Sequence, residues 1–194
     1  MIFKKIQWIF ISLYIKLIVP KAYKMPTEDR FFLESKLFKE ITLNYDNSKI
    51  LFVGVHKYSS WYATIFNNFT SNTFFTIDTE FDYSKNKYGT SFHSVGDFLT
   101  HNFNRRFDII IFNGIFSYGI NEVNLQKKAI LKIHKLLSND SSYFIFGYRD
   151  HIDLKEEVNN LIKNKFRKVT FKNIESDLIV NSDNNHKFSF WRLN

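Results

Sequence analysis

Residues 107–114, with the sequence FDIIIFNG, carry the clearest strand signal in the chain. The run before Asn113 is almost unbroken in large apolar side chains, and such a run suits a strand whose two faces are both buried. Asp108 is its one polar residue, and we expect it to be structural. Asn113 and Gly114 predict that the strand ends in a loop. A strand of this kind requires parallel neighbours and helices that cover both faces.

The flanking sequence alternates short apolar runs with helical periodicity. Strands are predicted at residues 50–53, 73–77, 91–95, 107–112 and 142–146, and helices at residues 60–69, 121–137 and 153–164. This alternation predicts parallel strands joined by right-handed crossovers. Two further strand patterns, 166–171 and 187–193, have no helix between them and are therefore expected to pair antiparallel. The predicted fold class is α/β, with a mostly parallel sheet, a C-terminal antiparallel strand pair and N-terminal helices.

Composition limits the classes of function. The chain has 194 residues, 44% of them hydrophobic, which suits a globular domain and excludes disorder over most of its length. Cysteine is absent, which excludes disulfides, thiolate metal sites and cysteine nucleophiles and fits a reducing compartment, so a cytoplasmic location is expected. The formal net charge is +8, but the lysines are scattered as singles and pairs, which does not favour a nucleic-acid partner. The six histidines lack the close paired spacing of a metal site, so we expect no bound metal.

Residues 2–19 form the one segment with the apolar content of a targeting or membrane element. Lysines interrupt it, it falls short of the roughly 20 apolar residues of a spanning helix, and no convincing cleavage site follows. A weakly amphipathic helix is predicted instead. It either lies on an anionic membrane surface, since no acidic residue precedes Glu28, or packs on the domain or on a partner subunit, as in a homodimer. A second helix is predicted from Thr27 to Ile41, so residues 1–47 are expected to be N-terminal helices and residues 48–194 the α/β domain.

Glycines mark one edge of the predicted sheet. Four of the six closely follow predicted strands: Gly54, Gly96, Gly114 and Gly147. Open parallel sheets bind ligands at this carboxyl edge, but glycines also end strands for structural reasons, and both interpretations stay open. Asp78 ends the second strand, 24 residues after Gly54, where nucleotide-binding folds place a carboxylate for the ribose hydroxyls. A turn or cap role for Asp78 is the alternative, with Glu80 as the substitute carboxylate.

In chain order, these residues resemble the motifs of the class I S-adenosylmethionine-dependent methyltransferases. Gly54 follows the first strand, Asp78 the second, Gly96-Asp97 the third, and FDIIIF leads into Asn113-Gly114. The terminal strand pair resembles that family's antiparallel hairpin, and the match spans about residues 49–194. More narrowly, FNGIFSYG at residues 112–119, with the preceding KYGT, resembles a subgroup of methyltransferase-like proteins associated with bacterial surface-glycan synthesis.

The resemblance implies a Rossmann-like methyltransferase sheet, S-adenosylmethionine as the cofactor, and methyl transfer to a small-molecule or sugar acceptor. It assigns Gly54 and its neighbours to the methionine part of the cofactor, Asp78 with Thr79 to the ribose, and Asp97 with Phe98 to the adenine. Asn113 and Gly114 would face the methionine end and the acceptor. The implied cofactor-binding residues are Val53, Gly54, Val55, His56, Tyr58, Asp78, Thr79, Asp97, Phe98, Asn113 and Gly114.

The first motif departs from the family pattern. The family's acid-x-Gly-x-Gly-x-Gly falls here on Phe52, Gly54, His56 and Tyr58, so one glycine of three is kept and the acid is lost. Bulky side chains at these positions would narrow the cofactor's path, so the alternative function is a non-catalytic binding module with the same fold. An RNA methyltransferase is a further alternative that rests on net charge alone. A nicotinamide-dependent oxidoreductase fits less well, because its Gly-x-Gly-x-x-Gly loop would fall on Gly54, His56 and Ser59.

Methyl transfer from a sulfonium is an in-line displacement, so the protein supplies alignment and, for a hydroxyl acceptor, a group that takes up the proton. The predicted bases are His151 and Asp150, just beyond the 142–146 strand, and Tyr118 completes the catalytic set as a polar contact. The ordinary histidine pKa of about 6.5 suits a base at neutral pH. The alternative for His151 is a surface position without a role in catalysis.

Overall fold

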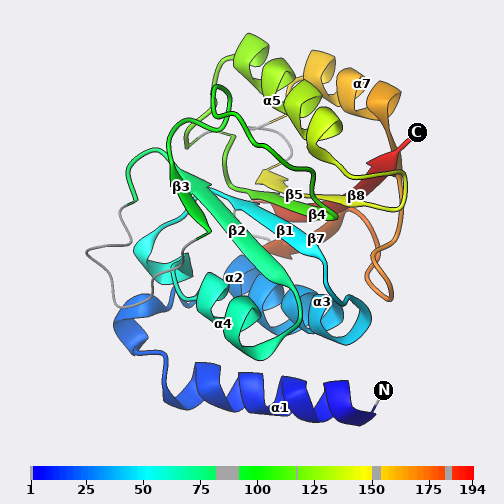
Figure 1. Cartoon of the computed structure of the whole chain (residues 1–194). Helices are drawn as coiled ribbons and strands as arrows, with labels where there is room; N and C mark the ends of the chain where they lie inside the picture. Colours follow the sequence, from blue (N-terminus) through cyan, green and yellow to red (C-terminus); the bar gives the residue numbers. More distant parts are fainter. Residues whose placement is uncertain (1, 82–91, 117, 150–153, 182–184) are drawn as a thin grey trace.

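The computed structural model describes residues 2–81, 92–116, 118–149, 154–181 and 185–194. One mixed sheet forms the middle layer, and helices cover both of its faces (Figure 1). Its strands are β1 (Lys49–Val53), β2 (Thr73–Asp78), β3 (His93–Val95), β4 (Ile109–Asn113), β5 (Tyr143–Arg149), β6 (Phe166–Lys168), β7 (Leu178–Asn181) and β8 (His186–Leu193). The helical segments are α1 (Ile2–Leu17), η1 (Lys21–Tyr23), α2 (Glu28–Phe32), η2 (Leu33–Leu37), α3 (Phe38–Asn44), η3 (Lys57–Ser59), α4 (Tyr62–Phe69), α5 (Val123–Leu136) and α7 (Glu156–Lys165).

The strand order is β3-β2-β1-β4-β5-β8-β6, and β7 pairs with the first part of β8. The five strands from β3 to β5 are parallel, whereas β8 runs antiparallel to β5, β6 and β7. The predicted fold class is therefore confirmed, including the antiparallel pairing of the last strand with residues 166–168. Asp108 is structural as expected, because its Oδ2 accepts a hydrogen bond of 2.8 Å from the N–H of Lys49 and so ties the start of β4 to β1.

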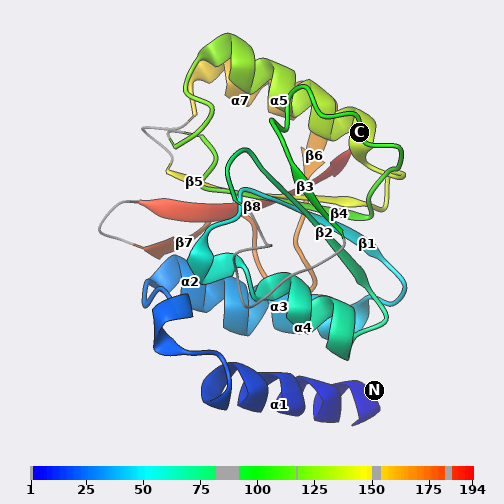
Figure 2. The same cartoon turned by 60° about the vertical axis from the view of Figure 1, so that its left-hand side comes forward.

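Successive residues of β4 point to opposite faces of the sheet. Ile109 and Ile111 belong to the core under α2, α3 and α4, whereas Ile110 and Phe112 belong to the core under α5 and α7 (Figure 2). All four side chains are fully buried. The prediction of a strand buried on both faces is confirmed, and it follows from the two-residue side-chain period of a strand between two helical layers.

Residues 28–44 form one continuous helical rod, in which η2 is a π-helical turn between α2 and α3. Leu33, Leu37 and Ile41 are spaced four residues apart, so they lie on one face, and all three are fully buried against the sheet. Phe31 points away from this face and is 68% exposed. The rod therefore contributes to the same core as the sheet, and it brings the start of α2 to the carboxyl edge of β1.

The helix α1 lies outside the layer formed by α3 and α4 (Figure 2). Its inner side holds the fully buried Ile11, the ring of Tyr14 at 5.0 Å from that of Phe69, and Gln7, whose amide donates to the Phe69 carbonyl. Its outer side is apolar and exposed: Ile2, Phe3, Ile6, Ile9, Phe10, Leu13 and Leu17. Among the described residues, no helix has both the length and the apolar content needed to cross a membrane.

Candidate functional site

A cavity of about 550 Å³, the main cavity, lies at the carboxyl ends of β1, β2, β4 and β5. Parallel strands expose their carboxyl ends at a single edge, which is where open α/β sheets bind ligands. The segment from Met25 to Arg30 contributes part of the wall. The volume lies within the range of about 300–1,000 Å³ that is usual for small-molecule sites.

The loop after β1 is fixed by Asp78 at the end of β2. Gly54 has a φ of +85°, a conformation that glycine adopts without strain. The N–H of Val55 donates to Oδ2 of Asp78 at 3.0 Å. Oδ1 of Asp78 accepts from the N–H groups of Glu80 and Phe81, at 2.9 and 3.0 Å. Asp78 thus has the turn role that the sequence offers as an alternative. A carboxylate has about four acceptor positions, and three are used, so one position remains free on Oδ2.

The loop after β4 places an amide at the main cavity. Oδ1 of Asn113 lies 3.0 Å from Nε2 of the buried His186. Nδ2 of Asn113 is buried and has no hydrogen-bond partner. Gly147 faces Asn113 across β4 and β5 and makes room for it, because a Cβ at this glycine would lie 1.9 Å from Oδ1 of Asn113. The unpartnered Nδ2 is a donor that a ligand in the cavity can satisfy.

Large side chains stand where the first motif has lost its glycines. The ring of Tyr58 lies 4.6 Å from that of His56, and the guanidinium carbon of Arg30 lies 4.7 Å from the centre of the Tyr58 ring. Nη2 of Arg30 donates to the Tyr58 hydroxyl at 3.2 Å. All three side chains belong to the cavity wall. The substitutions at residues 56 and 58 therefore reshape the wall and leave the cavity open.

Most of the implied cofactor-binding residues meet at the main cavity. They are Gly54, Val55, His56, Tyr58, Asp78, Thr79, Asn113 and Gly114. Tyr118 lines it as well, with its ring 5.2 Å from the guanidinium carbon of Arg149. His151 and Asp150, the predicted bases, lie outside the described residues.

Three implied cofactor-binding residues do not line the main cavity. Val53 is buried within β1. Phe98 is 5% exposed and packs edge-on against Phe112 in the core under α5, at 5.6 Å between ring centres, so its face is not available to an adenine. Asp97 is exposed, and its Oδ1 accepts from the N–H of Leu99 at 2.8 Å in a local turn. Neither residue expected at the adenine lines the main cavity, although Gly96, next to Asp97, donates its N–H to the carbonyl of Asp78 at 2.8 Å.

Besides Glu80, the substitute carboxylate, four charged or titratable residues of the wall are not among the implied site residues: Asp29, Arg30, Arg149 and His186. A signal for Arg30 was present, since it is the one arginine among the first 104 residues of a lysine-rich chain. His186 reaches the cavity because the antiparallel β8 runs beside β5, with His186 opposite Arg149. That placement depends on strand order, which the sequence pattern does not give.

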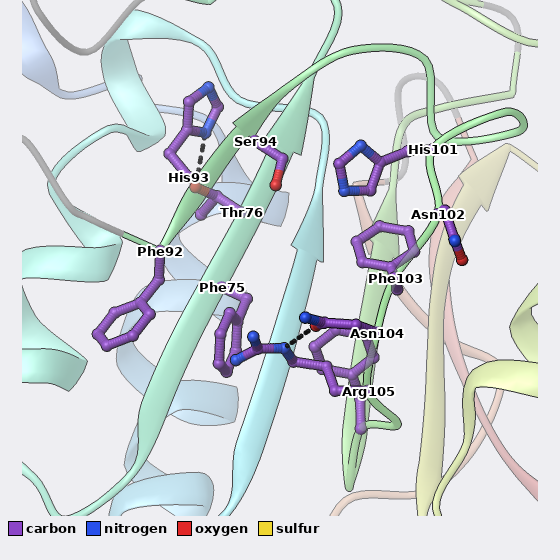
Figure 3. Close-up of a pocket in the computed structure, with 11 residues that line it drawn as sticks. Phe75, Thr76, Phe92, His93, Ser94, His101, Asn102, Phe103, Asn104 and Arg105 are labelled. Carbon is purple, nitrogen blue, oxygen red and sulfur yellow. Dashed lines mark hydrogen bonds between the residues drawn. The ribbon is translucent and has the colours of Figure 1, made fainter.

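A smaller cavity of about 290 Å³ lies at the β3 edge of the sheet (Figure 3). There Arg105 lies over the ring of Phe75, at 4.7 Å, and its Nε donates to Oδ1 of Asn104 at 3.0 Å. Nδ1 of His93 lies 2.8 Å from the hydroxyl of Thr76. Among the described residues, those directly after β1, β2 and β4 do not line it. The position of this cavity is therefore not the one at which a parallel sheet binds its ligand.

A wider groove of about 800 Å³, the apolar groove, adjoins the main cavity and shares Met25 and Thr27 with it. It lies between the start of α2 and β7, which Figure 2 shows side by side. Phe31 and Ile179, which are 68% and 54% exposed, supply much of its apolar surface. A second, larger molecule bound in this groove would therefore reach the edge of the main cavity.

Glu34 lines the apolar groove, and its side chain is half-buried. Burial raises the pKa of Glu34 to about 7, although the hydroxyl of Tyr62 donates to its Oε1 at 2.7 Å and Arg30 lies nearby. Both of these neighbours favour the charged form, so burial is the larger effect. The carboxyl of Glu34 therefore titrates near neutral pH.

Comparison of the sequence with models of known protein families and with curated proteins gives no match. Solved structures do match. The N-methyltransferase NodS from Bradyrhizobium japonicum, in complex with S-adenosyl-L-homocysteine, is similar with a TM-score of 0.65 at 13% identity, over 96% of this chain and 98% of that chain. A TehB-like SAM-dependent methyltransferase from Corynebacterium glutamicum gives 0.61 at 12% identity, over 97% and 98%. The CcbJ methyltransferase from Streptomyces caelestis gives 0.59 at 10% identity, over 89% and 94%.

Because the sequence identities are this low, the matches show a shared fold and nothing finer. They cover nearly all of this chain and of each matched chain. The family resemblance read from Gly54, Asp78 and the FDIIIF strand is thus supported independently by the shape of the chain. This protein has the fold of the class I S-adenosylmethionine-dependent methyltransferases.

Proposed function

We propose that this protein binds S-adenosylmethionine in the main cavity and transfers its methyl group to a small-molecule acceptor. One observation carries the proposal: the residues that follow β1, β2 and β4 line a single cavity whose buried donors lack partners. Nδ2 of Asn113 and two nitrogens of Arg30 are buried without a hydrogen bond. Unpartnered buried donors are rare in folded proteins, and a bound ligand with acceptor groups is a common explanation.

The residues present fit the parts of this cofactor. Gly54 and Val55 would hold the methionine part, because both lie in the wall of the main cavity, where the bare Cα of Gly54 packs against Ile115. Asp78, with one acceptor position left on Oδ2, and the exposed Thr79 would meet the ribose hydroxyls. Asn113, next to the open space at Gly114, would face the methionine end and the acceptor.

When bound, the cofactor supplies a methyl group on a positively charged sulfur. The chain's own task is to align the acceptor with that methyl group and to exclude water from the cavity. For a hydroxyl acceptor, His151 or Asp150 would take up the proton, and Tyr118 would contact the acceptor through its hydroxyl. Both predicted bases follow β5, whose carboxyl end borders the main cavity.

The apolar groove supports an acceptor with an apolar part. A molecule seated along Phe31 and Ile179 would bury their exposed side chains and extend toward Met25 at the edge of the main cavity. A sugar acceptor, as in surface-glycan synthesis, would then carry an alkyl or lipid group. Transfer of a labelled methyl group to an alkyl glycoside should proceed with a higher kcat/KM than transfer to the free sugar, and Phe31→Asp should remove the difference. Equal values for the two acceptors would contradict this assignment.

Calorimetric titration tests cofactor binding directly. We expect S-adenosylmethionine and S-adenosylhomocysteine to bind the full-length protein, and NAD, the ligand of the rival oxidoreductase function, to give no heat. Asp78→Asn should weaken both about tenfold or more, because it removes a charged acceptor. The matched control is Asp140→Asn, which changes an exposed acid in the turn before β5, at the opposite edge of the sheet, and should leave the affinity within about twofold. Absence of heat for both sulfur ligands would refute the proposal.

The outer face of α1 supports peripheral binding to an anionic membrane. Its exposed isoleucine, leucine and phenylalanine side chains form one continuous face of the helix, and a surface of this kind is usually covered in use. Lys5 and Lys16 are exposed on the same helix beside it, and no acidic residue occurs before Glu28. The helix thus combines apolar side chains that enter the lipid interface with cations that attract anionic headgroups. We therefore propose a membrane surface as its partner; self-association through α1 is the competing occupant.

A further inference from the structure

Arg30 and Asp29 are adjacent charges of opposite sign on the wall of the main cavity. The Arg30 and Asp29 side chains are 10% and 16% exposed, so both charges are largely removed from water. Nε of Arg30 lies 3.7 Å from Oδ2 of Asp29, which is too long for a hydrogen bond. The two groups therefore attract each other while their hydrogen-bonding capacity stays largely unused.

The guanidinium of Arg30 donates from Nη2 to the hydroxyl of Tyr58 at 3.2 Å, and the hydroxyl of Tyr62 and the carboxyl of Glu34 lie near it on the protein side. Nε and Nη1 are buried and have no partner. An arginine side chain carries five N–H donors and does not lose its charge in proteins, so it cannot relieve this deficit by deprotonation. Arg30 as a whole is 9% exposed and lines the main cavity, so an acceptor group of a ligand bound there would lie beside the guanidinium.

Tyr58 holds the guanidinium in position. The Arg30 guanidinium stacks on the Tyr58 ring at 4.7 Å, and the ring packs in turn on His56 at 4.6 Å. These are the two positions at which the first motif has lost its glycines. Large residues at the two positions therefore fix a charged side chain where a glycine-rich loop would offer backbone N–H groups.

We infer that Arg30 and Asp29 bind the zwitterionic amino-acid end of the ligand, with Arg30 on the carboxylate and Asp29 on the ammonium group. The inference rests on the proposed function, because the methionine part of S-adenosylmethionine is the group with this charge pattern. A planar guanidinium matches a carboxylate through paired N–H···O bonds, and a charged pair on the wall complements both charges of the ligand at once. Arg30 is thus a binding residue that replaces part of the lost glycine motif.

Two ligands separate this inference from the proposed function. S-Adenosylhomocysteine carries the amino-acid end, whereas 5′-methylthioadenosine has the same nucleoside and sulfur without it. We expect Arg30→Met to weaken S-adenosylhomocysteine about tenfold to a hundredfold in calorimetric titration of the full-length protein. The affinity for 5′-methylthioadenosine should change by less than about twofold, since that ligand has no carboxylate for Arg30 to bind.

The control variant is Arg105→Met, because Arg105 also stacks on an aromatic ring, that of Phe75, but lies in the cavity at the β3 edge. It should leave both affinities unchanged. Arg30→Lys keeps the charge without the planar fork and should fall between the wild type and Arg30→Met. If Arg30→Met does not fold, as judged by circular dichroism, Asp29→Asn replaces it and should likewise weaken S-adenosylhomocysteine selectively.

The outcomes are distinct. Selective loss of S-adenosylhomocysteine supports the inference. Equal loss of both ligands, or no loss of either, overturns the inference and leaves the proposed function standing. A wild-type protein that binds neither ligand refutes the proposed function, and this inference with it.

Discussion

Residue 147 must be a glycine because the side chain of Asn113, on the neighbouring strand β4, occupies the space that a Cβ would need. A Cβ at Gly147 would lie 1.9 Å from Oδ1 of Asn113 and 2.9 Å from Cε1 of Phe188. Glycine otherwise weakens a strand, so its presence within β5 reflects this close approach. The same contact keeps the Asn113 amide at the main cavity and within 3.0 Å of His186.

Gly147→Ala should lower the free energy of unfolding by about 2 kcal/mol, because overpacking at this distance forces neighbouring side chains out of their preferred rotamers. Urea unfolding measures the change. Asn113→Ala removes the nearest clashing atoms, so the double variant should be about 1 kcal/mol more stable than the sum of the single variants predicts. Strict additivity of the two substitutions would show that the contact is not formed.

Glu34 should make the stability of the protein depend on pH. Burial raises its pKa to about 7 from an ordinary value of 4.5. Between these two values the folded protein keeps a proton that the unfolded chain has released, so the contribution of Glu34 to the free energy of unfolding falls as the pH rises through this window. The contribution is complete below the unfolded pKa and lost above the folded one.

Glu34→Gln keeps an acceptor for the hydroxyl of Tyr62 and removes the titration. The variant and the wild type should have similar unfolding free energies near about pH 4.5, and at about pH 8 the variant should be more stable by about 2 kcal/mol. Urea unfolding at the two pH values provides the comparison. A difference between variant and wild type that stays constant with pH would argue against the raised pKa.

Among the elements, α1 has one face buried against the domain and one face exposed. Replacing Phe3 and Phe10 by serine, at 78% and 63% exposure, changes the outer face while the inner contacts of Ile11 and Tyr14 remain. We expect the full-length double variant to bind vesicles containing phosphatidylglycerol at least about tenfold more weakly than the wild type, since each large apolar side chain contributes to interfacial binding. Sedimentation with the vesicles measures the partition.

Val95→Ser is the matched control, because Val95 is apolar and 62% exposed but lies on β3, away from α1. It should not alter vesicle binding. Equal partition of the wild type and the Phe3, Phe10 double variant would exclude the membrane role. Wild-type dimers that dissociate in the same double variant would assign the face to self-association instead.

A strand could be predicted from the sequence where both of its faces are buried. β4 was readable because its side chains are apolar on both faces, as a strand between two helical layers requires. β7 was missed, because Leu178 and Ile179 remain 38% and 54% exposed and the strand pairs only with β8 at the margin of the sheet. The sequence pattern does not show that the ring of Phe98 packs in the core, since this follows from the local turn that begins at Asp97.

In the whole molecule, the candidate site forms where distant segments meet. Glycine and acid positions after β1, β2 and β4 could be read from the sequence, because parallel strands bring their carboxyl ends to one edge. The remaining wall could not, since Arg30 arrives on a helix that precedes the sheet and His186 on an antiparallel strand near the C-terminus. Such contacts follow from tertiary packing. The order of the strands in the sheet and the position of the N-terminal helix cannot be read from local sequence patterns.

The measurement closest to the central claim is a crystal structure of the full-length protein grown with S-adenosylhomocysteine. We predict density for the ligand in the main cavity, with the ribose at Asp78, the amino-acid end at Arg30 and Asp29, and the sulfur facing Asn113. Phe98 should stay in the core and not contact the adenine. A cavity that remains empty at saturating ligand, or ligand bound instead in the cavity at the β3 edge, would contradict the account.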